Sequence, residues 1–156
     1  MNILGLKSLE FTLMRTIPAK PSEIFGLWLD PTQAGNPWHK MKGMIFNPKV
    51  GGLFYRMHPS DDGKQELAHY GRFTILKRAN KIQYTWVSQH TRGIESIVTL
   101  TLQAKGDETI VNLKHENLPD DEFGRLHKNG WNFYLGQLSK AVTEKLKKVR
   151  IKRGLS

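Results

Sequence analysis

The chain has 156 residues, of which 38% are hydrophobic and 24% are charged, and its formal net charge is +10. This is the composition of a folded globular protein and excludes a disordered chain. The length is that of one domain with a core large enough to fold without metal or disulfide support. Because the sequence contains no cysteine, disulfides and thiol catalysis are excluded.

The N-terminal segment, residues 1–20, lacks the basic region, apolar core and small-residue cleavage site of a signal peptide. No apolar stretch approaches the roughly 20 residues that a membrane-spanning helix requires. The lack of cysteine also fits a reducing compartment. We therefore expect a cytoplasmic protein that does not insert into a membrane.

The positive charge is concentrated near the C-terminus. Residues 140–153 include seven lysine or arginine residues and one glutamate, so this segment supplies six of the ten net positive charges. Cations are favoured at the end of a helix, and a solvated helix end explains the cluster. Attraction to nucleic acid or to an anionic membrane is the alternative, and it would not depend on base sequence.

The first elements are expected to be a strand and two short helices. Residues 10–17 alternate imperfectly between apolar and polar side chains, as an edge strand does. Ser22 is a candidate N-cap for a helix whose apolar stripe lies within residues 24–28. The pair Asp30-Pro31 ends that helix and is a candidate cap for a second short helix from Thr32 towards Trp38.

From residue 44 the apolar period changes to two, and glycine- and proline-containing turns separate the segments. The pattern predicts strands over residues 44–46, 53–58, 67–76, 82–88, 95–103 and 109–116. Strands at this spacing form hairpins, so we expect a meandering antiparallel sheet of six strands, or seven with the first one.

The last segment has the period of a long amphipathic helix that begins near Asp120. Its apolar face is marked by Trp131, Leu135 and Leu138. Glycine weakens a helix interior, so we expect a bend or a break near Gly130. A sheet and one long helix must bury their apolar faces against each other, which predicts an α+β sandwich.

A set of sparse motifs then suggests a family. In chain order they are Asp30-Pro31, Trp38, Gly51-Gly52, Gly71, Tyr84-Thr85-Trp86, residues 109–115 and Gly130-Trp131. Together they resemble the Hsp90-ATPase-activator-homologue-like branch of the START/Bet v 1-like superfamily. The resemblance implies a helix-grip fold, in which a curved antiparallel sheet wraps a long C-terminal helix around an apolar cavity. We expect one such domain over residues 1–156, with a basic tail from about residue 145.

Alternation along the strands predicts which side chains face the helix. The strand over residues 53–58 is ambiguous, because Leu53, Tyr55 and Met57 compete with Phe54, Arg56 and His58. We favour Phe54, because the family resembled here has an aromatic residue after Gly-Gly-x. The residues expected to line a ligand site are Trp38, Phe54, Phe73, Tyr84, Trp86, Ser96, Val98, His115, Trp131, Leu135 and Leu138.

These residues form a mostly apolar set with a few polar groups, as in small-molecule pockets, although a plain core has the same composition. Tyr84, Ser96 and His115 would orient the ligand. A histidine at the position of His115 often follows the Thr-x-Leu-x-Leu-x pattern in the family, and its ring could bind a ligand or act as a base. A structural hydrogen bond to a loop is the alternative role.

The leading functional prediction is the binding of a small apolar or amphipathic molecule between the sheet and the C-terminal helix. A protein-interaction module related to Hsp90 co-chaperone activators, with a chaperone or other protein partner, is one alternative. A cyclase or dehydratase that uses His115 or Tyr84 is another, although the sequence shows no catalytic constellation. Homodimers occur among helix-grip relatives, but no patch in this sequence argues for one.

Metal, cofactor and nucleic-acid sites are not expected. The six histidines show no metal-binding spacing, and there is no cysteine ligand. The sequence also has neither a phosphate-binding loop nor a nucleophile elbow. Binding of nucleic acid through the basic tail would be unspecific and would weaken steeply with salt.

Overall fold

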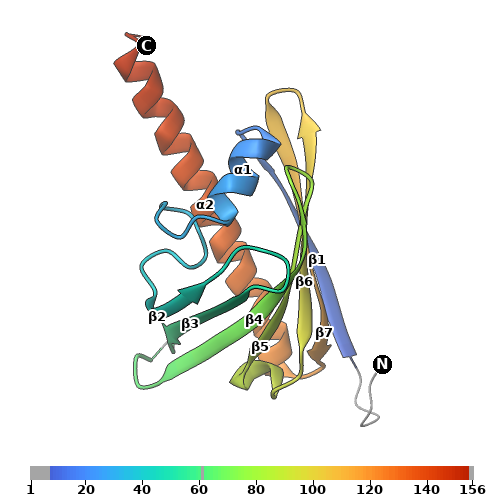
Figure 1. Ribbon diagram of the computed structural model, residues 1–156. Coiled ribbons are helices and arrows are strands. Elements are labelled where there is room, and N and C mark those ends of the chain that lie inside the picture. The colour runs from blue at the N-terminus through green and yellow to red at the C-terminus, as the bar shows by residue number, and fades with distance from the viewer. Residues whose placement is uncertain (1–7, 61, 155–156) are drawn as a thin grey trace.

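The computed structural model describes residues 8–60 and 62–154, with the side chain of Lys42 left out. It is an α+β fold in which a curved antiparallel sheet lies against one long helix (Figure 1). The strands are β1 (Ser8–Ile17), β2 (Lys42–Phe46), β3 (Leu53–Pro59), β4 (Glu66–Lys77), β5 (Lys81–Ser88), β6 (Ser96–Lys105) and β7 (Glu108–Pro119). The helices are α1 (Pro21–Trp28), the 3-10 turn η1 (Gln89–Thr91) and α2 (Glu122–Lys152).

The seven strands lie in the order β1-β7-β6-β5-β4-β3-β2, and every neighbouring pair is antiparallel. Strands β2 to β7 therefore follow one another as hairpins, and β1 joins the sheet at the outer edge of β7. This confirms the predicted antiparallel meander and the α+β class. The described part of the chain contains no helix long and apolar enough to cross a membrane.

Gly71 explains how a large ring packs against the inner face of the sheet. It pairs with Phe54 across β3 and β4. A Cβ atom on Gly71 would lie 2.0 Å from the carbonyl oxygen of Thr85 and 2.7 Å from the ring of Phe54. Only glycine therefore allows the Phe54 ring to lie over β4, which confirms Phe54 as the inward residue of its strand.

Helix α1 starts two residues earlier than it would with Ser22 as its N-cap. Lys20 is the N-cap, and Pro21 takes the first helical position. Proline suits this position because an N–H there would have no partner within the helix. The buried face of α1 consists of Ile24, Phe25, Leu27 and Trp28, as the apolar stripe in the sequence predicted.

The second short helix was wrongly predicted. Residues 29–41 form a series of turns, in which Gln33 N donates to Asp30 O at 3.1 Å and Asn36 N donates to Gln33 O at 3.3 Å. Gly35 adopts a positive φ of 93°, and proline at 31 and 37 has no N–H to continue a helix.

This turn segment is nonetheless anchored. The Asn36 side chain donates to the carbonyl oxygens of Leu27 and Trp28, at 2.8 Å each, and accepts from the N–H of Trp38 at 2.7 Å. One buried amide thus ties the turns to the end of α1. The result is that Trp38 is carried into the interior, where it is fully buried.

Helix α2 runs without a break for 31 residues, so the expected break near Gly130 is wrong. Gly130 lies on the exposed side, where a Cβ atom would meet nothing within 4 Å. Trp131, Leu135, Leu138 and Val142 are its buried face. The C-terminal part of α2 extends beyond the sheet, and residues 144–153 are exposed (Figure 1).

Candidate ligand-binding site

The interior between α2 and strands β3, β4 and β5 is built largely of aromatic rings. Helix α2 lies close to β1, β7 and the η1 turn. Over the other half of the sheet, side chains fill the space between the helix and the strands. Neighbouring ring centroids lie 5.0–6.5 Å apart. We call the following residues the aromatic cluster: Trp28, Trp38, Phe46, Phe54, Phe73, Tyr84, Trp86, Trp131 and Tyr134.

The structure brings the predicted site residues together. Each of the residues Trp38, Phe54, Phe73, Tyr84, Trp86, Ser96, Val98, His115, Trp131, Leu135 and Leu138 has at most 3% of its surface exposed. They come from the turn segment, from β3 to β7 and from α2, and they share one continuous interior. Their role in ligand binding stays a prediction.

Arg56 lies in the same interior and was missing from the predicted site. It sits on β3 and is 2% exposed. Its Cζ atom is 5.0 Å from the ring centroid of Trp86 and 4.9 Å from that of Tyr134. Nη1 donates a short hydrogen bond of 2.5 Å to the carbonyl oxygen of Pro37. The guanidinium is therefore held between two aromatic faces and the turn segment.

The sequence did contain a signal for Arg56. Period two places residues 54, 56 and 58 on one face of β3, so choosing Phe54 as inward places Arg56 inward as well. A charged side chain on an inward face is rare unless it is paired.

Several buried polar atoms of the interior have no hydrogen-bond partner among the described residues. They are Trp28 Nε1, Trp38 Nε1, Arg56 Nε, Tyr84 Oη and Trp86 Nε1. Folded proteins satisfy nearly all such groups, because each unsatisfied one costs about 1–3 kcal/mol. An otherwise apolar interior thus holds a concentration of unsatisfied donors.

The Tyr84 hydroxyl is neutral in this setting. Burial raises the pKa of Tyr84 far above the physiological range, while the neighbouring Trp28 indole and Arg56 guanidinium oppose the rise. Desolvation also lowers the pKa of Arg56, and Tyr134 opposes that change. Because a guanidinium keeps its proton in proteins, Arg56 remains a cation.

His115 is fully engaged in a hydrogen-bond chain across the fold. The indole N–H of Trp131 donates to His115 Nδ1 at 2.9 Å, and His115 Nε2 contacts Ser96 Oγ at 2.8 Å. Ser96 Oγ in turn donates to the carbonyl oxygen of Trp86 at 2.5 Å. Since Nδ1 accepts, Nε2 carries the proton and donates to Ser96.

This chain fixes both ring nitrogens of His115. Burial holds the pKa of His115 well below its usual range, and the nearby His127 lowers it further, so the ring is neutral. No lone pair is left to take a proton from a bound molecule. The arrangement links β5, β6 and β7 to α2, and His115 is suited here to positioning these elements rather than to proton transfer.

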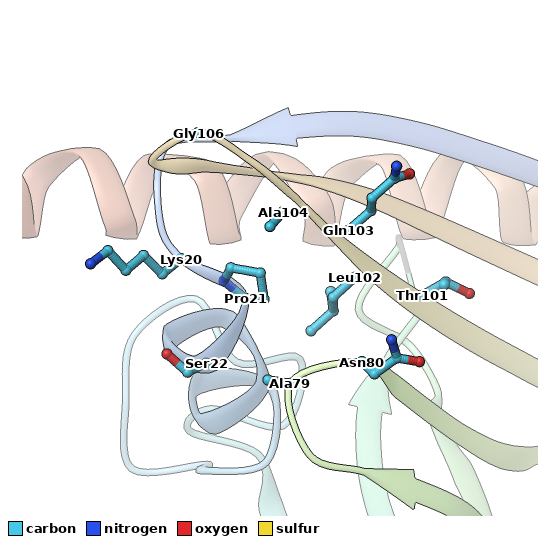
Figure 2. Close-up of a pocket in the computed structure, with 10 residues that line it drawn as sticks. All are labelled: Lys20, Pro21, Ser22, Ala79, Asn80, Thr101, Leu102, Gln103, Ala104 and Gly106. Carbon is cyan, nitrogen blue, oxygen red and sulfur yellow. The ribbon is translucent and has the colours of Figure 1, made fainter.

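A separate depression lies on the surface (Figure 2). It is formed by the start of α1, the β4–β5 turn and the β6–β7 hairpin, and it is lined by Lys20, Pro21, Ser22, Ala79, Asn80, Thr101, Leu102, Gln103, Ala104 and Gly106. Its volume of about 730 Å³ would suit a small molecule. It is open to solvent, however, and none of the unsatisfied buried donors belongs to its lining.

Among the described residues, no group of three or more histidine, aspartate or glutamate side chains is arranged to hold a metal ion. The interior therefore offers aromatic walls, one fixed positive charge and hydrogen-bond donors.

Three solved structures show what the fold resembles. A protein from Chromobacterium violaceum is 23% identical, with a TM-score of 0.70 over 86% of this chain and 97% of that one. An AHSA1-like protein from Aeromonas hydrophila is 16% identical, with a TM-score of 0.66 over 88% and 94%. The Aha1 dimer from Colwellia psychrerythraea is 15% identical, with a TM-score of 0.65 over 86% and 96%. At these identities the likeness is one of fold.

No curated protein shows significant sequence similarity to the chain. The sequence pattern of one family, described as Activator of Hsp90 ATPase homolog 1-like protein, matches residues 18–143. That range includes α1, the whole sheet except β1 and most of α2. The chain therefore belongs to the Activator of Hsp90 ATPase homolog 1-like family.

Proposed function

We propose that this protein binds a small apolar or amphipathic molecule in the interior between α2 and strands β3, β4 and β5. The observation that carries the proposal is the group of buried donors without partners inside the aromatic cluster. Sites for small molecules combine apolar walls with a few polar groups that fix orientation. A plain protein core, in contrast, satisfies its buried polar groups internally.

The wall most suited to opening is the turn segment, residues 29–41. It has no regular secondary structure and closes over the aromatic cluster through Trp38. Its anchors are the hydrogen bonds of the Asn36 side chain and the bond from Arg56 to Pro37. Segments of this kind open at lower free energy than sheet or helix, and they serve as gates in many binding proteins.

The first experiment uses N-phenyl-1-naphthylamine, a neutral apolar dye that fluoresces when it leaves water. We expect saturable binding to the folded protein. Trp86→Leu should weaken binding at least about tenfold, because the ring lies at the centre of the cluster. Phe133→Leu is the matched control, because Phe133 is 60% exposed, and it should bind as the wild type does.

Thermal unfolding of each variant shows whether it is folded. Mass spectrometry of the denatured wild type, with Trp86→Leu beside it, identifies any compound that is purified with the protein. A folded wild type that carries no compound and shows no saturable dye binding would contradict the proposal.

A second candidate function is protein interaction through the outer face of the sheet. Ile45, Tyr55 and Tyr70 are cross-strand neighbours on β2, β3 and β4. Ile45 is 59% exposed and Tyr70 is 49% exposed. Contiguous apolar surface of this kind marks interaction sites, and the relative from Colwellia psychrerythraea is described as a dimer. A second copy of the chain is the partner we would test.

Light scattering after size-exclusion chromatography measures the oligomeric state. Ile45→Lys should dissociate a dimer that uses this face, whereas Met14→Lys on β1, a still more exposed position, should not. A monomeric wild type would contradict the dimer. A chaperone partner is tested by an Hsp90 ATPase assay at saturating protein, where an unchanged rate would exclude stimulation.

A further inference from the structure

We infer that the bound molecule carries an anionic group, a carboxylate in the simplest case, that pairs with Arg56 inside the aromatic cluster. The inference rests on the proposed function and names the chemical class of its ligand. It is carried by the juxtaposition of a buried guanidinium, a set of unsatisfied donors and the absence of a nearby carboxylate among the described residues.

The charge of Arg56 is buried and has no ion-pair partner among the described residues. Arg56 is 2% exposed, and none of the ion pairs formed by the described residues includes it. Its contacts are the Pro37 carbonyl oxygen, the face of Trp86, and the face and hydrogen-bonding side chain of Tyr134, which are all neutral. Buried charges in proteins are paired with an opposite charge, because an unpaired one costs several kcal/mol (about 3–5 when a partner is removed). The interior therefore has a positive charge that a ligand could neutralise.

The unsatisfied polar atoms around Arg56 are all able to donate a hydrogen bond. Arg56 Nε and the indole nitrogens of Trp28, Trp38 and Trp86 can only donate, and Tyr84 Oη can donate as well. A carboxylate supplies acceptor sites and no donor. An alcohol or an amide brings fewer acceptors and adds a donor that would need a partner of its own. The unsatisfied groups therefore match an anion better than a neutral polar group.

The position of the Arg56 guanidinium indicates where a ligand would lie. Nη1 of Arg56 is already bonded to Pro37, which leaves the Nε side of the guanidinium for a ligand. A carboxylate that accepts from Nε would form a charge-assisted hydrogen bond, which is among the stronger polar contacts in proteins. The Trp86 ring lies 5.0 Å from the guanidinium and 5.0 Å from the Trp131 ring. An anion at Arg56 would thus place the apolar part of its ligand along Trp86 and Trp131.

The experiment compares 2-naphthoate with 2-naphthamide by calorimetry at pH 7.5. The two probes share a ring system and differ in charge. We expect the wild type to bind the carboxylate at least about tenfold more tightly, since charge-assisted hydrogen bonds contribute about 1.5–3 kcal/mol. Arg56→Met should abolish this preference by weakening the binding of 2-naphthoate much more than that of 2-naphthamide. The matched control, Arg78→Met, removes an exposed arginine in the β4–β5 turn and should keep the preference.

The outcomes separate the two proposals. Equal affinity for both probes in the wild type, unaffected by Arg56→Met, would overturn the anionic ligand and leave the binding function standing. Ordered water would then be the expected partner of the unsatisfied donors in the aromatic cluster. Binding of neither probe to the folded wild type would count against both proposals.

The stability of Arg56→Met gives a further readout. A purely structural role predicts a lower Tm with no change in probe preference. The role proposed here predicts that the preference for the carboxylate is lost whatever the change in Tm, because Arg56 also holds the turn segment through Pro37. If Arg56→Met does not fold, Arg56→Lys takes its place. The ratio of its affinities for 2-naphthoate and 2-naphthamide is then compared with the ratio in the wild type.

Discussion

At the scale of a single residue, Tyr84 combines a ring that stabilises the fold with a hydroxyl that opposes folding. Its ring contacts Trp38, Phe54 and Phe73 and is fully buried, and this packing stabilises the fold. Its hydroxyl makes no hydrogen bond of normal geometry among the described residues, although the Trp28 indole lies nearby, and its lost hydration opposes folding. A group of this kind is retained where it serves a purpose other than stability.

Tyr84→Phe should therefore stabilise the protein, by up to about 1–3 kcal/mol of unfolding free energy, because it deletes an unsatisfied hydroxyl and keeps the ring. Urea denaturation measures the change. Tyr70→Phe is the control, since its hydroxyl belongs to a residue that is 49% exposed and its removal should be nearly neutral. A clear loss of stability in Tyr84→Phe would show that the hydroxyl is bonded to water or to protein.

At the scale of elements, two glycines in α2 have opposite roles. Gly124 lies in the first turn beside the cap, where Asp121 accepts from its N–H at 2.8 Å. A Cβ atom there would lie 1.9 Å from the carbonyl oxygen of Pro119. Gly130 faces open space, so its lack of a side chain serves no packing purpose in the helix.

We expect Gly130→Ala to stabilise the protein by about 0.5–1 kcal/mol, the gain of alanine over glycine in a helix interior. Gly124→Ala should destabilise it, because the β7–α2 junction must move to admit the methyl group. Thermal unfolding of the pair compares one chemical change at two sites of one helix. Equal shifts in Tm would show that the close approach at Pro119 relaxes without cost.

At the scale of the whole molecule, buried histidines make stability depend on pH. Burial is the main cause that lowers the pKa of His69, to about 3, with the positive charge of Arg56 as the next cause. Burial likewise lowers the pKa of His115 and of His127. The folded state thus keeps these rings neutral at a pH where the unfolded chain, with an ordinary pKa of 6.5, protonates them.

The free energy of unfolding should therefore fall as the pH drops below 6.5, since the unfolded state binds more protons. Each such ring contributes about 1.4 kcal/mol per pH unit until its folded-state pKa is reached. Urea denaturation between pH 6.5 and 4.5 tests this, above the range where the carboxylates of Asp30, Asp62 and Asp121 protonate. His69→Gln should reduce the slope, and a flat profile in the wild type would contradict the account.

Much of the architecture could be predicted from local patterns. Alternation placed Tyr84, Trp86 and Val98 on the inner face of the sheet, and helical spacing placed Trp131 and Leu135 on the buried face of α2; all are buried. Such patterns are reliable because the pleat of a strand and the turn of a helix repeat at fixed periods. The failures occurred where local signals compete. Proline and glycine prevented a helix after Asp30, while α2 continues through Gly130 without a break.

The sequence by itself determined the class of fold, the family and the inner faces of its elements, because these follow from short-range periodicity and from motifs along the chain. The tertiary structure alone decided which polar groups in the interior are satisfied. His115 is engaged because α2 brings Trp131 to it, whereas Arg56 meets two aromatic faces and no carboxylate among the described residues. These contacts join residues far apart in the chain, and no local pattern encodes which partners a folded interior brings together.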